Sequence, residues 1–364
     1  MKAAVCFEPN SRLEVVDLDQ EGPQAGEARV QVKAAGVCHS DWHIMNGDWP
    51  VPLPMVLGHE AAGIVKEVGP GVTSVKPGDH VIFSFRPHCG RCYYCSIGRS
   101  VLCDGYTSPR WLMLDGTPRL TRGGKPINQM ARIGTFSEFV VCAAEMLVPI
   151  NTEMPWPQAA LVGCCVPTGW GAVNRCARVE AGASVVVIGC GGVGLNVVQG
   201  ARLAGAGLIV AVDLLENKLE FARRFGATHT VNATHTNVVE EVRGLTGGRG
   251  AEYAFDAIGS EATTLQILDA VRPGGTAVIV GMAPTGARAP IAPYPMALQE
   301  KTIKGTLYGS VRPNIDFPIL VDLYLSGRLQ IDPLVSRTYT LDQINEGFAA
   351  MRGGQVARGV VVFN

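Results

Sequence analysis

The sequence predicts an α/β protein with two domains, one β-rich and one built on a doubly wound parallel sheet. Three observations support this prediction. The chain has 364 residues, which is longer than a single hydrophobic core usually grows. Residues 1–165 combine short β-like segments with Pro and Gly turn signals. Residues 166–307 alternate short apolar runs with helical patterns, and residues 308–364 change character again.

The β-rich part shows no long helical periodicity. The segments 29–37 (RVQVKAAGV) and 61–69 (AAGIVKEVG) are typical of short strands, and turn signals such as GPGV and KPGDH follow them. Residues 104–134 are rich in Gly, Pro and Arg and predict a long loop. A loop of that length is usually functional or packs on a partner.

The second part has a β-α-β-α-β order, which is half of a doubly wound sheet. It begins with the apolar run SVVVIG at 184–189, which suits a buried parallel strand. The further expected elements of this part are helices at 193–204, 216–226 and 260–272 and strands at 208–213, 229–232, 251–259 and 276–281. Near the end of the chain we expect a helix at 341–352, followed by a strand at 359–363. The apolar residues on one face of that helix are Leu341, Ile344, Phe348 and Met351.

Composition excludes several classes of function. Apolar residues make up 47% of the chain and charged residues 17%, with a formal net charge of −1. This balance provides no basic field for nucleic acid or for an anionic membrane. The first residues run into polar sequence without a signal-peptide core, and no apolar run reaches the length of a membrane span. Eleven clustered cysteines favour metal binding or catalysis over a disulfide framework, so we expect a cytoplasmic protein.

A dinucleotide-binding pattern follows the first apolar run of the second part. Gly189, Gly191 and Gly194 form G-x-G-x-x-G between an expected strand and an expected helix, and Asp213 ends the next strand. Such glycines let the backbone approach a pyrophosphate at the helix N-terminus. An Asp here accepts from the ribose hydroxyls and repels a 2′-phosphate, which favours NAD over NADP. Lys218 is a further candidate for the ribose or a solvated side chain, and a structural Gly turn with a surface Asp is the alternative.

Four cysteines lie close together in HCGRCYYCSIGRSVLC. Cys89, Cys92, Cys95 and Cys103 have the spacing C-x2-C-x2-C-x7-C, which suits a closed, structural tetrathiolate zinc site. The alternatives are an iron–sulfur cluster and free buried cysteines. A DNA-binding zinc module is disfavoured by the neutral net charge.

A second candidate metal set is dispersed along the β-rich part. Cys38 lies in GVCHSDWH and His59 in LGHEAAG, and a third ligand could come from Cys164 or Cys165 in GCCVPTG. Neighbouring side chains in an extended segment point in opposite directions, so we expect these two cysteines to serve different sites. A Cys2His set leaves a fourth zinc position for water or substrate.

Taken together, these motifs resemble the zinc-dependent medium-chain alcohol dehydrogenase family over essentially the whole chain. The resemblance rests on GVCHSD, GHEAAG, the four-cysteine lobe, GC-x3-TG, GxGxxG with its Asp, and the closing ARGVVVF. It implies a GroES-like catalytic domain over 1–165 and 308–364, with the structural zinc lobe near 85–105. It also implies a Rossmann NAD-binding domain over 166–307, with NAD and two Zn²⁺ per chain as cofactors.

The resemblance assigns roles to individual residues. Cys38, His59 and Cys164 match the catalytic zinc ligands, whereas Cys165 occupies a position that is commonly Gly. Glu60 matches a carboxylate close behind the zinc, and the remaining matches lie in the first motif. Asp41 matches the partner of the His ligand, Ser40 the hydroxyl that bonds the substrate oxygen, and His43 the imidazole that passes the proton to solvent.

The same comparison of motifs gives a cofactor set. Arg358 matches a basic residue near the pyrophosphate, and His39 occupies a second such position, where a neutral His would weaken pyrophosphate binding. Thr168 and Gly169 are expected to begin the helix that enters the cofactor domain. The full expected set is His39, Thr168, Gly189, Gly191, Gly192, Val193, Gly194, Asp213, Lys218, Val280 and Arg358.

Three aromatic residues are candidates for lining the substrate pocket. Phe85 and Trp49 match pocket-lining positions and favour an apolar primary alcohol, aromatic or allylic, unless they only pack the domain. Trp111 is expected near the pocket mouth. The alternative is the glutathione-dependent formaldehyde dehydrogenase branch, which DGTPRLT and GTFSEF resemble. That branch has an Arg where this chain has Thr107, with Arg110 nearby, and usually a Tyr in place of His43.

Two other classes remain as alternatives. A zinc-free quinone-reductase-like relative would lack Cys38, His59 and Cys164, and a non-enzymatic dinucleotide sensor would have no reason to keep Ser40 and His43. By analogy with the family, we expect small alcohols or aldehydes as substrates, with no nucleic acid and no membrane as partners. We also expect a homodimer, with a homotetramer as the alternative.

Overall fold

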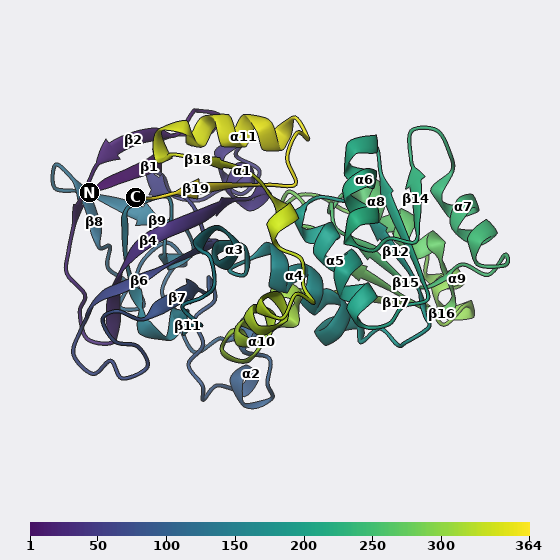
Figure 1. Cartoon of the computed structure of the whole chain (residues 1–364), viewed down its shortest axis with the longest axis horizontal. Helices are drawn as coiled ribbons and strands as arrows, with labels where there is room; N and C mark the ends of the chain where they lie inside the picture. The colour runs from purple at the N-terminus through teal and green to yellow at the C-terminus, as the bar shows by residue number, and fades with distance from the viewer. The chain divides into compact units, whose positions relative to one another are not determined.

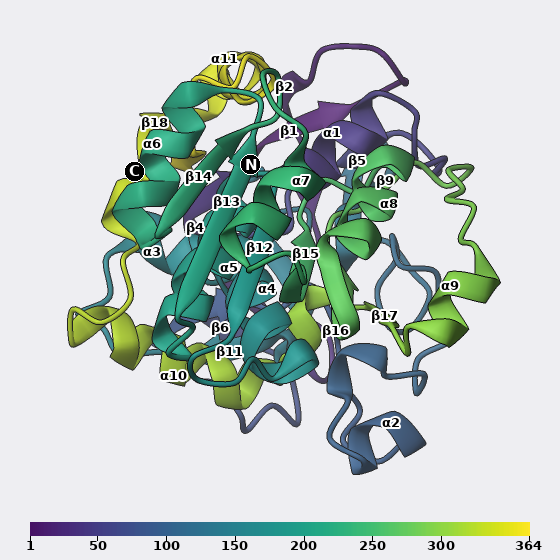
Figure 2. The ribbon, with the colours of Figure 1, turned by 90° about the vertical axis from the view of Figure 1, so that its right-hand side faces the viewer.

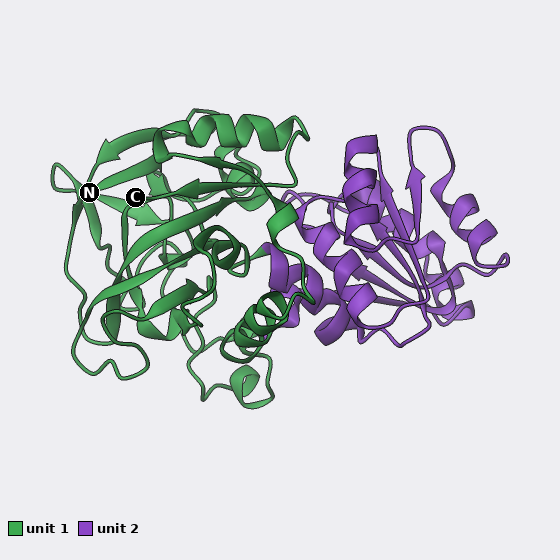
Figure 3. Cartoon of the chain, viewed as in Figure 1, with its two compact units in different colours: residues 1–164, 312–364 green, residues 165–311 purple.

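The computed structural model describes all 364 residues and divides them into two compact units (Figure 3). Unit 1 comprises residues 1–164 and 312–364, and unit 2 comprises residues 165–311. The expected boundaries after residues 165 and 307 lie close to these positions. Both units contain sheets and helices, so the α/β class expected from the sequence is confirmed.

Unit 1 contains two sheets with short helices around them (Figure 1). One sheet has the strand order β2-β1-β5-β9-β8-β3, and the other has β11-β7-β6-β4-β19-β18 with β10 added on β4. The strands are β1 Lys2–Cys6, β2 Glu14–Asp17, β3 Asp19–Gln20, β4 Glu27–Val37, β5 Met55–Val56, β6 Ala61–Val68, β7 His80–Phe83, β8 Leu120–Arg122, β9 Lys125–Gln129, β10 Phe139–Ala143, β11 Leu147–Pro149, β18 Val335–Tyr339 and β19 Arg358–Val362. The helices are α1 His39–Met45, α2 Tyr93–Ser96, α3 Trp156–Leu161, α10 Pro313–Leu325 and α11 Ile344–Arg352.

The long strand β4 organises unit 1 because it pairs with β6, β10 and β19. Its burial alternates along most of its length, which fits a strand with one face on the core. The core beneath it includes Val30, Val32 and Phe136, and α11 adds Ile344 and Phe348 to the same cluster. The apolar face expected for the last helix is therefore confirmed, although residues 341–343 form a 3₁₀ turn before α11 begins.

Unit 2 is a six-stranded parallel sheet in the order β14-β13-β12-β15-β16-β17, and Figure 2 shows these strands side by side. This order is the doubly wound arrangement in which a nucleotide binds where the strand order reverses, here next to β12. The elements are α4 Cys165–Gly171, β12 Ser184–Ile188, α5 Gly192–Leu203, β13 Leu208–Asp213, α6 Glu216–Phe225, β14 His229–Asn232, α7 Val238–Leu245, β15 Ala251–Asp256, α8 Glu261–Ala270, β16 Val271–Ile279, α9 Pro293–Leu298 and β17 Thr302–Gly305, with a π-helical turn at Ala172–Ala177.

Three local expectations from the sequence are wrong. Residues 104–134 are not one loop, because β8 and β9 form a hairpin there around Gly123 and Gly124. The segment GCCVPTG is not extended, since residues 162–164 form a turn and α4 begins at Cys165. For the same reason Thr168 and Gly169 lie inside α4 rather than at its start.

Candidate functional site

Cys38, His59 and Cys164 form a buried cluster in unit 1. Their ligand atoms all lie within 4.8 Å of one another, and no side chain of the three is more than 7% exposed. They come from three separate places: the residue before α1, the turn between β5 and β6, and the turn after α3. Two sulfurs and one imidazole nitrogen are a donor set that zinc prefers, so the residues present fit that metal.

The Asp41 carboxylate brings two of these segments together. Its Oδ2 accepts from the backbone N–H of Cys38 at 3.2 Å, which places Asp41 in the first turn of α1 as a helix-capping acid. Its Oδ1 accepts from the backbone N–H of Gly58 at 3.0 Å and from Nδ1 of His59 at 3.1 Å. Because a carboxylate only accepts, the His59 ring must carry its hydrogen on Nδ1, which leaves Nε2 to face a metal.

The electrostatics of the cluster fit a cation site. A hydrogen bond from Cys164, against the opposing effect of burial and with the charges of Arg358 and His59, holds the pKa of Cys38 well below its usual value. Burial lowers the pKa of His59, but the charges of Asp41 and Cys38 outweigh burial and raise that pKa to about 10. A thiolate and a protonated imidazole in contact are the metal-free form of this donor set, and a bound metal replaces the proton.

Glu60 and Arg358 form a buried ion pair next to this cluster. The Glu60 side chain is fully buried and Arg358 is 6% exposed, and Nη2 of Arg358 contacts Oε2 of Glu60. Arg358 is the first residue of β19, which pairs with β4, and Glu60 directly follows His59. The pairing puts Arg358 beside the metal ligands, while its expected contact with a pyrophosphate stays a prediction.

The remaining residues of the first motif lie on α1. Ser40 is half-buried, and its Oγ is 3.9 Å from the Cys38 sulfur. His43 stacks on Trp49 with 4.7 Å between ring centroids, and its Nδ1 contacts Oδ2 of Asp48 at 2.9 Å. His39 is exposed at the start of the helix. Asp48 was not foreseen, because a lone acid five residues after a His carries no recognisable signal.

The other two aromatic candidates also pack in unit 1. The Phe85 ring meets the His59 ring edge-on at 5.4 Å, so it borders the cluster directly. Trp111 is partly buried against the core of unit 1, and its carbonyl accepts from the backbone N–H of Gln129 at 3.0 Å. Phe85 therefore borders the Cys-His-Cys cluster through His59, and Trp49 borders His43.

Cys165 lies in different surroundings from Cys164. It is fully buried as the first residue of α4, and its sulfur is 4.0 Å from the Asn196 side-chain nitrogen within unit 2. The two cysteines thus have different neighbours, as expected. The reason differs from the one expected, because Cys164 ends the turn after α3 and Cys165 begins α4, so neither lies in an extended segment.

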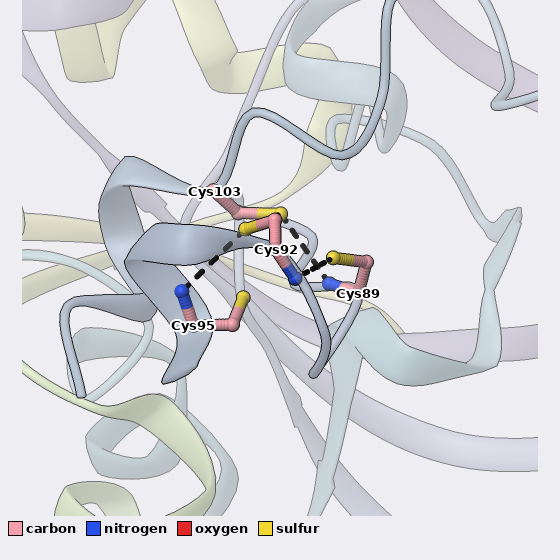
Figure 4. Close-up of side chains that lie close together, drawn as sticks. All are labelled: Cys89, Cys92, Cys95 and Cys103. Atoms are coloured by element: carbon pink, nitrogen blue, oxygen red, sulfur yellow. Dashed lines mark hydrogen bonds between the residues drawn. The ribbon is translucent and has the colours of Figure 1, made fainter. Parts of the chain in front are cut away.

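The four lobe cysteines converge on a common point (Figure 4). Backbone N–H groups donate to their sulfurs, from Cys89 to Cys103 at 3.3 Å, from Cys92 to Cys89 at 3.2 Å and from Cys95 to Cys92 at 3.5 Å. The N–H of Arg91, helped by that of Cys92 and opposed by burial, lowers the pKa of Cys89 to about 7. A Cβ at Gly105 would lie 2.5 Å from the Cys89 sulfur, so only glycine fits against this cluster. Four thiolates leave no open position, which fits a structural zinc.

The glycine motif of unit 2 forms a tight turn between β12 and α5. Gly189 has a φ of +94°, and a Cβ at Gly194 would collide with the Gly189 carbonyl. By contrast, a Cβ at Gly191, the residue that caps α5, would meet nothing within 4 Å. This open space at a helix N-terminus fits a pyrophosphate group. Gly192 and Val193 supply the first turn of the same helix.

Asp213 is held rigidly where β13 ends. Its Oδ2 accepts from the backbone N–H of Cys190 at 2.8 Å, and its Oδ1 accepts from Leu214 and Leu215 at 2.8 and 3.1 Å. Lys218 is half-buried, and its charge acts on Cys190 in the glycine loop. Of the other expected cofactor residues, Thr168 is buried within α4, and Val280 is buried after β16 with its N–H on the Asp256 carbonyl at 2.9 Å.

Comparisons with known proteins agree with this geometry. Residues 24–152 match the alcohol dehydrogenase GroES-like domain, and residues 192–326 match the zinc-binding dehydrogenase domain. The chain is 42% identical to the NDMA-dependent alcohol dehydrogenase of Amycolatopsis methanolica, over 99% of this chain and 98% of the relative. This chain belongs to the zinc-dependent alcohol dehydrogenase family. Family membership makes it an enzyme with a GroES-like domain and a parallel-sheet cofactor-binding domain.

Other members of the family differ in their named substrates. The S-(hydroxymethyl)glutathione dehydrogenase of Paracoccus denitrificans is 42% identical, over 100% of this chain and 99% of the relative. The crystal structure of benzyl alcohol dehydrogenase from Acinetobacter calcoaceticus superposes with a TM-score of 0.94 at 32% identity, covering 100% of this chain and 99% of the other. No helix of this alcohol dehydrogenase is both long and apolar enough to cross a membrane.

Proposed function

We propose that this alcohol dehydrogenase oxidises an apolar primary alcohol to the aldehyde, with NAD as hydride acceptor, and that the reaction is reversible. The observation that carries the substrate class is the position of two aromatic rings. Phe85 meets the ring of the ligand His59, and Trp49 stacks on His43. Flat apolar walls of this kind favour aromatic or allylic alcohols and leave little room for branched secondary ones.

The metal proposal is one Zn²⁺ in each of the two cysteine-containing clusters. Held by Cys38, His59 and Cys164, a zinc ion would supply Lewis acidity that lowers the pKa of an alcohol hydroxyl. Asp41 orients the His59 ring for this role through Nδ1. The zinc held by the four lobe cysteines would be structural.

The proton route uses side chains of α1. The Ser40 hydroxyl lies beside Cys38 and would accept the alcohol proton as it passes its own proton on toward His43. His43 would pass that proton to solvent from Nε2, because Asp48 occupies its Nδ1. The His43 side chain is 18% exposed, so the proton can leave from there to bulk water.

NAD is supported by the residues of unit 2. When bound, NAD supplies the acceptor for the hydride. The open position at Gly191 and the start of α5 suit its pyrophosphate, and the fixed Asp213 carboxylate suits the ribose hydroxyls of a cofactor without a 2′-phosphate. We place the reaction in the cytoplasm, since none of the eleven cysteines forms a disulfide and reduced cysteines persist in a reducing compartment.

S-(hydroxymethyl)glutathione is the second candidate substrate. Its support is the named activity of the Paracoccus denitrificans relative together with Arg110, an exposed cation seven residues after the last lobe cysteine. Thr107 and His43 count against it, because the resembling branch usually has Arg and Tyr at these places.

The test is NADH production by the purified, zinc-loaded enzyme with benzyl alcohol, 1-hexanol, 2-butanol, and formaldehyde plus glutathione. We expect kcat/KM for benzyl alcohol to exceed that for 2-butanol by about tenfold or more. A preference for formaldehyde plus glutathione would establish the second candidate instead. No turnover with any substrate in either direction would rule out both.

A further inference from the structure

A pocket of unit 1 next to the four-cysteine lobe is lined by three arginines. Arg86, Arg110 and Arg132 surround it together with Tyr106, Ser108 and the lobe ligand Cys103. The pocket encloses about 380 Å³, including its open mouth. Three like charges around one space repel each other, so their convergence needs an explanation.

Arg132 is the buried member of this arginine pocket. Arg132 is 5% exposed, and its Nη2 donates to the Ser108 carbonyl at 2.6 Å and to the Ser108 hydroxyl at 3.2 Å. Its Nε is buried without a hydrogen-bond partner. Leaving a donor of a charged group unpaired in the interior is costly.

The backbone supports this placement of Arg132. Ala131 and Arg132 have φ angles of 52° and 67°, in the left-handed region that residues with side chains seldom adopt. Two such residues in succession are held by the surrounding structure, and backbone conformations of this kind cluster at binding sites.

The other two arginines face the same space from the lobe side. Nε of Arg86 donates to the Val101 carbonyl at 2.8 Å, and Arg110 is exposed at the rim. Burial, together with the charges of Arg110 and Arg132, lowers the pKa of Arg86 to about 10. The three guanidinium groups therefore act on one another through the pocket.

Among the residues that line the pocket, only Cys103 and Tyr106 can carry a negative charge. The Cys103 thiolate attracts Arg86, and the Glu145 carboxylate attracts Arg132. Glu145 is itself occupied by the Tyr106 hydroxyl at 2.6 Å, and burial raises its pKa. No carboxylate lines the pocket itself.

We propose that Arg86, Arg110 and Arg132 form a binding site for an oxyanion, a carboxylate or phosphate group, that is separate from the Cys-His-Cys cluster. Guanidinium groups bind both of these anions through paired hydrogen bonds. The site is distinct because Phe85 packs on His59, whereas the next residue, Arg86, reaches Val101 in the lobe.

The experiment is a calorimetric titration of the zinc-loaded enzyme with phosphate and with malonate, at constant ionic strength set by chloride. Saturable binding of either anion is expected in the wild type. Arg110→Gln should weaken it about tenfold or more, because it removes one charge-assisted contact. Arg99→Gln, an exposed arginine of the lobe outside the pocket, is the matched control and should leave binding unchanged.

Glu145→Gln tests the same site in the opposite direction. The amide can still accept from Tyr106, but it removes the negative charge that partly neutralises Arg132, so anion binding should tighten. If neither anion binds, or if Arg110→Gln binds like the wild type, the proposal is wrong. A further outcome would also overturn the proposal: the wild type binds no anion, and Arg110→Gln loses the lobe zinc. The arginines would then only balance the charge of the thiolates.

The source of the oxyanion is decided by a second assay, which rests on the proposed function. kcat/KM is compared for 6-hydroxyhexanoate and 1-hexanol in the wild type and in Arg110→Gln. A loss confined to 6-hydroxyhexanoate identifies the carboxylate of the substrate, and unchanged values with anion binding in the calorimeter identify a free anion. Calorimetry requires no turnover, so a failure of the proposed function would not be mistaken for a failure of the site.

Discussion

Asp41 shows how one side chain can assemble a site from distant parts of a sequence. Its two oxygens accept from Cys38, Gly58 and His59, and it is completely buried. A buried carboxylate without these three donors would be strongly unfavourable. The same bonds that satisfy Asp41 thus hold Cys38 and His59 in the cluster whose ligand atoms lie within 4.8 Å of one another.

Cys164 and Cys165 provide the sharpest test at the level of residues. Cys164→Ala should abolish alcohol oxidation and remove one zinc per chain, because it takes away one of three metal ligands. Cys165→Ala should leave activity within about twofold and cost up to about 1–2 kcal/mol of stability through a small cavity. Metal analysis and initial rates measure both. The reverse pattern would mean that the assignment is off by one residue.

Asp48 is predicted to be a positioning residue for His43. Asp48→Asn should lower kcat for alcohol oxidation about tenfold, as part of the roughly 10²–10⁴-fold that a placed general base contributes. The hydrogen bond of His43 lowers the pKa of Asp48, so the Asp48 carboxylate is ionised and accepts from Nδ1 of His43. Without this acceptor the His43 ring loses the partner that fixes its orientation, and initial rates measure the resulting loss of kcat.

The control for this prediction is Asn46→Ala, which removes a side-chain contact to the other Asp48 oxygen at 3.1 Å and leaves the carboxylate in place. Zinc content should be normal in both variants. An unchanged kcat in Asp48→Asn with reduced stability would assign Asp48 a purely structural role.

At the level of elements, the parallel sheet was largely predictable and the β-rich part was less so. Strands β12 and β13 and helices α5 and α6 follow from apolar runs and helical periodicity, because buried parallel strands and amphipathic helices leave strong local patterns. The hairpin of β8 and β9 was missed although Gly123-Gly124 is a two-residue turn signal, because its strands are short and polar. The start of α4 was missed because Gly163 and Pro167 suggest a break.

The candidate site could be predicted from family motifs, but not from hydrophobic periodicity or residue spacing. Cys38, His59 and Cys164 follow from the resemblance, since their sequence separations say nothing about distance in space. The arginine pocket has no sequence signal, because Arg86 and Arg132 meet only after β7 and the β9 hairpin are in place. Long-range contacts of this kind are set by packing of the whole unit.

The four-cysteine lobe yields a prediction at the same level. Cys92→Ser should release one of two zinc ions per chain and lower the midpoint of thermal unfolding by several degrees, because short elements such as α2 rely on the metal for their packing. Ser96→Ala, on the exposed side of α2, is the control. Retention of two zinc ions by Cys92→Ser would contradict the tetrathiolate assignment. The structural role would be contradicted if Cys92→Ser stayed folded and kept its other zinc ion but no longer transferred hydride.

For the whole molecule, the open edge of unit 2 supports the expected homodimer. β17 pairs only with β16, and Tyr294 and Leu298 of the preceding helix are 76% and 69% exposed. Exposed strand edges with apolar neighbours are usually covered. Light scattering should therefore give a mass of twice the 38.6 kDa of one chain. Leu298→Asp should lower the measured mass toward that of one chain.

A matched control for the dimer is Leu245→Asp on α7, where Leu245 is 37% exposed. Helix α7 packs on α8 and on β14, the edge strand opposite β17. Leu245→Asp should leave the mass unchanged. A single-chain mass for the wild type at micromolar concentration would refute the dimer, and a fourfold mass would support the tetramer.

The buried pair of Glu60 and Arg358 has a consequence for biosynthesis. The ribosome synthesises Glu60 long before Arg358, and it likewise synthesises β4 long before its partner strand β19. At roughly 5–20 residues per second, translation of the intervening chain takes on the order of 15–60 s. Unit 2 is continuous in the sequence and is synthesised entirely within this interval. The nascent enzyme would therefore hold a complete parallel-sheet unit while Glu60 and β4 of unit 1 still lack their partners Arg358 and β19.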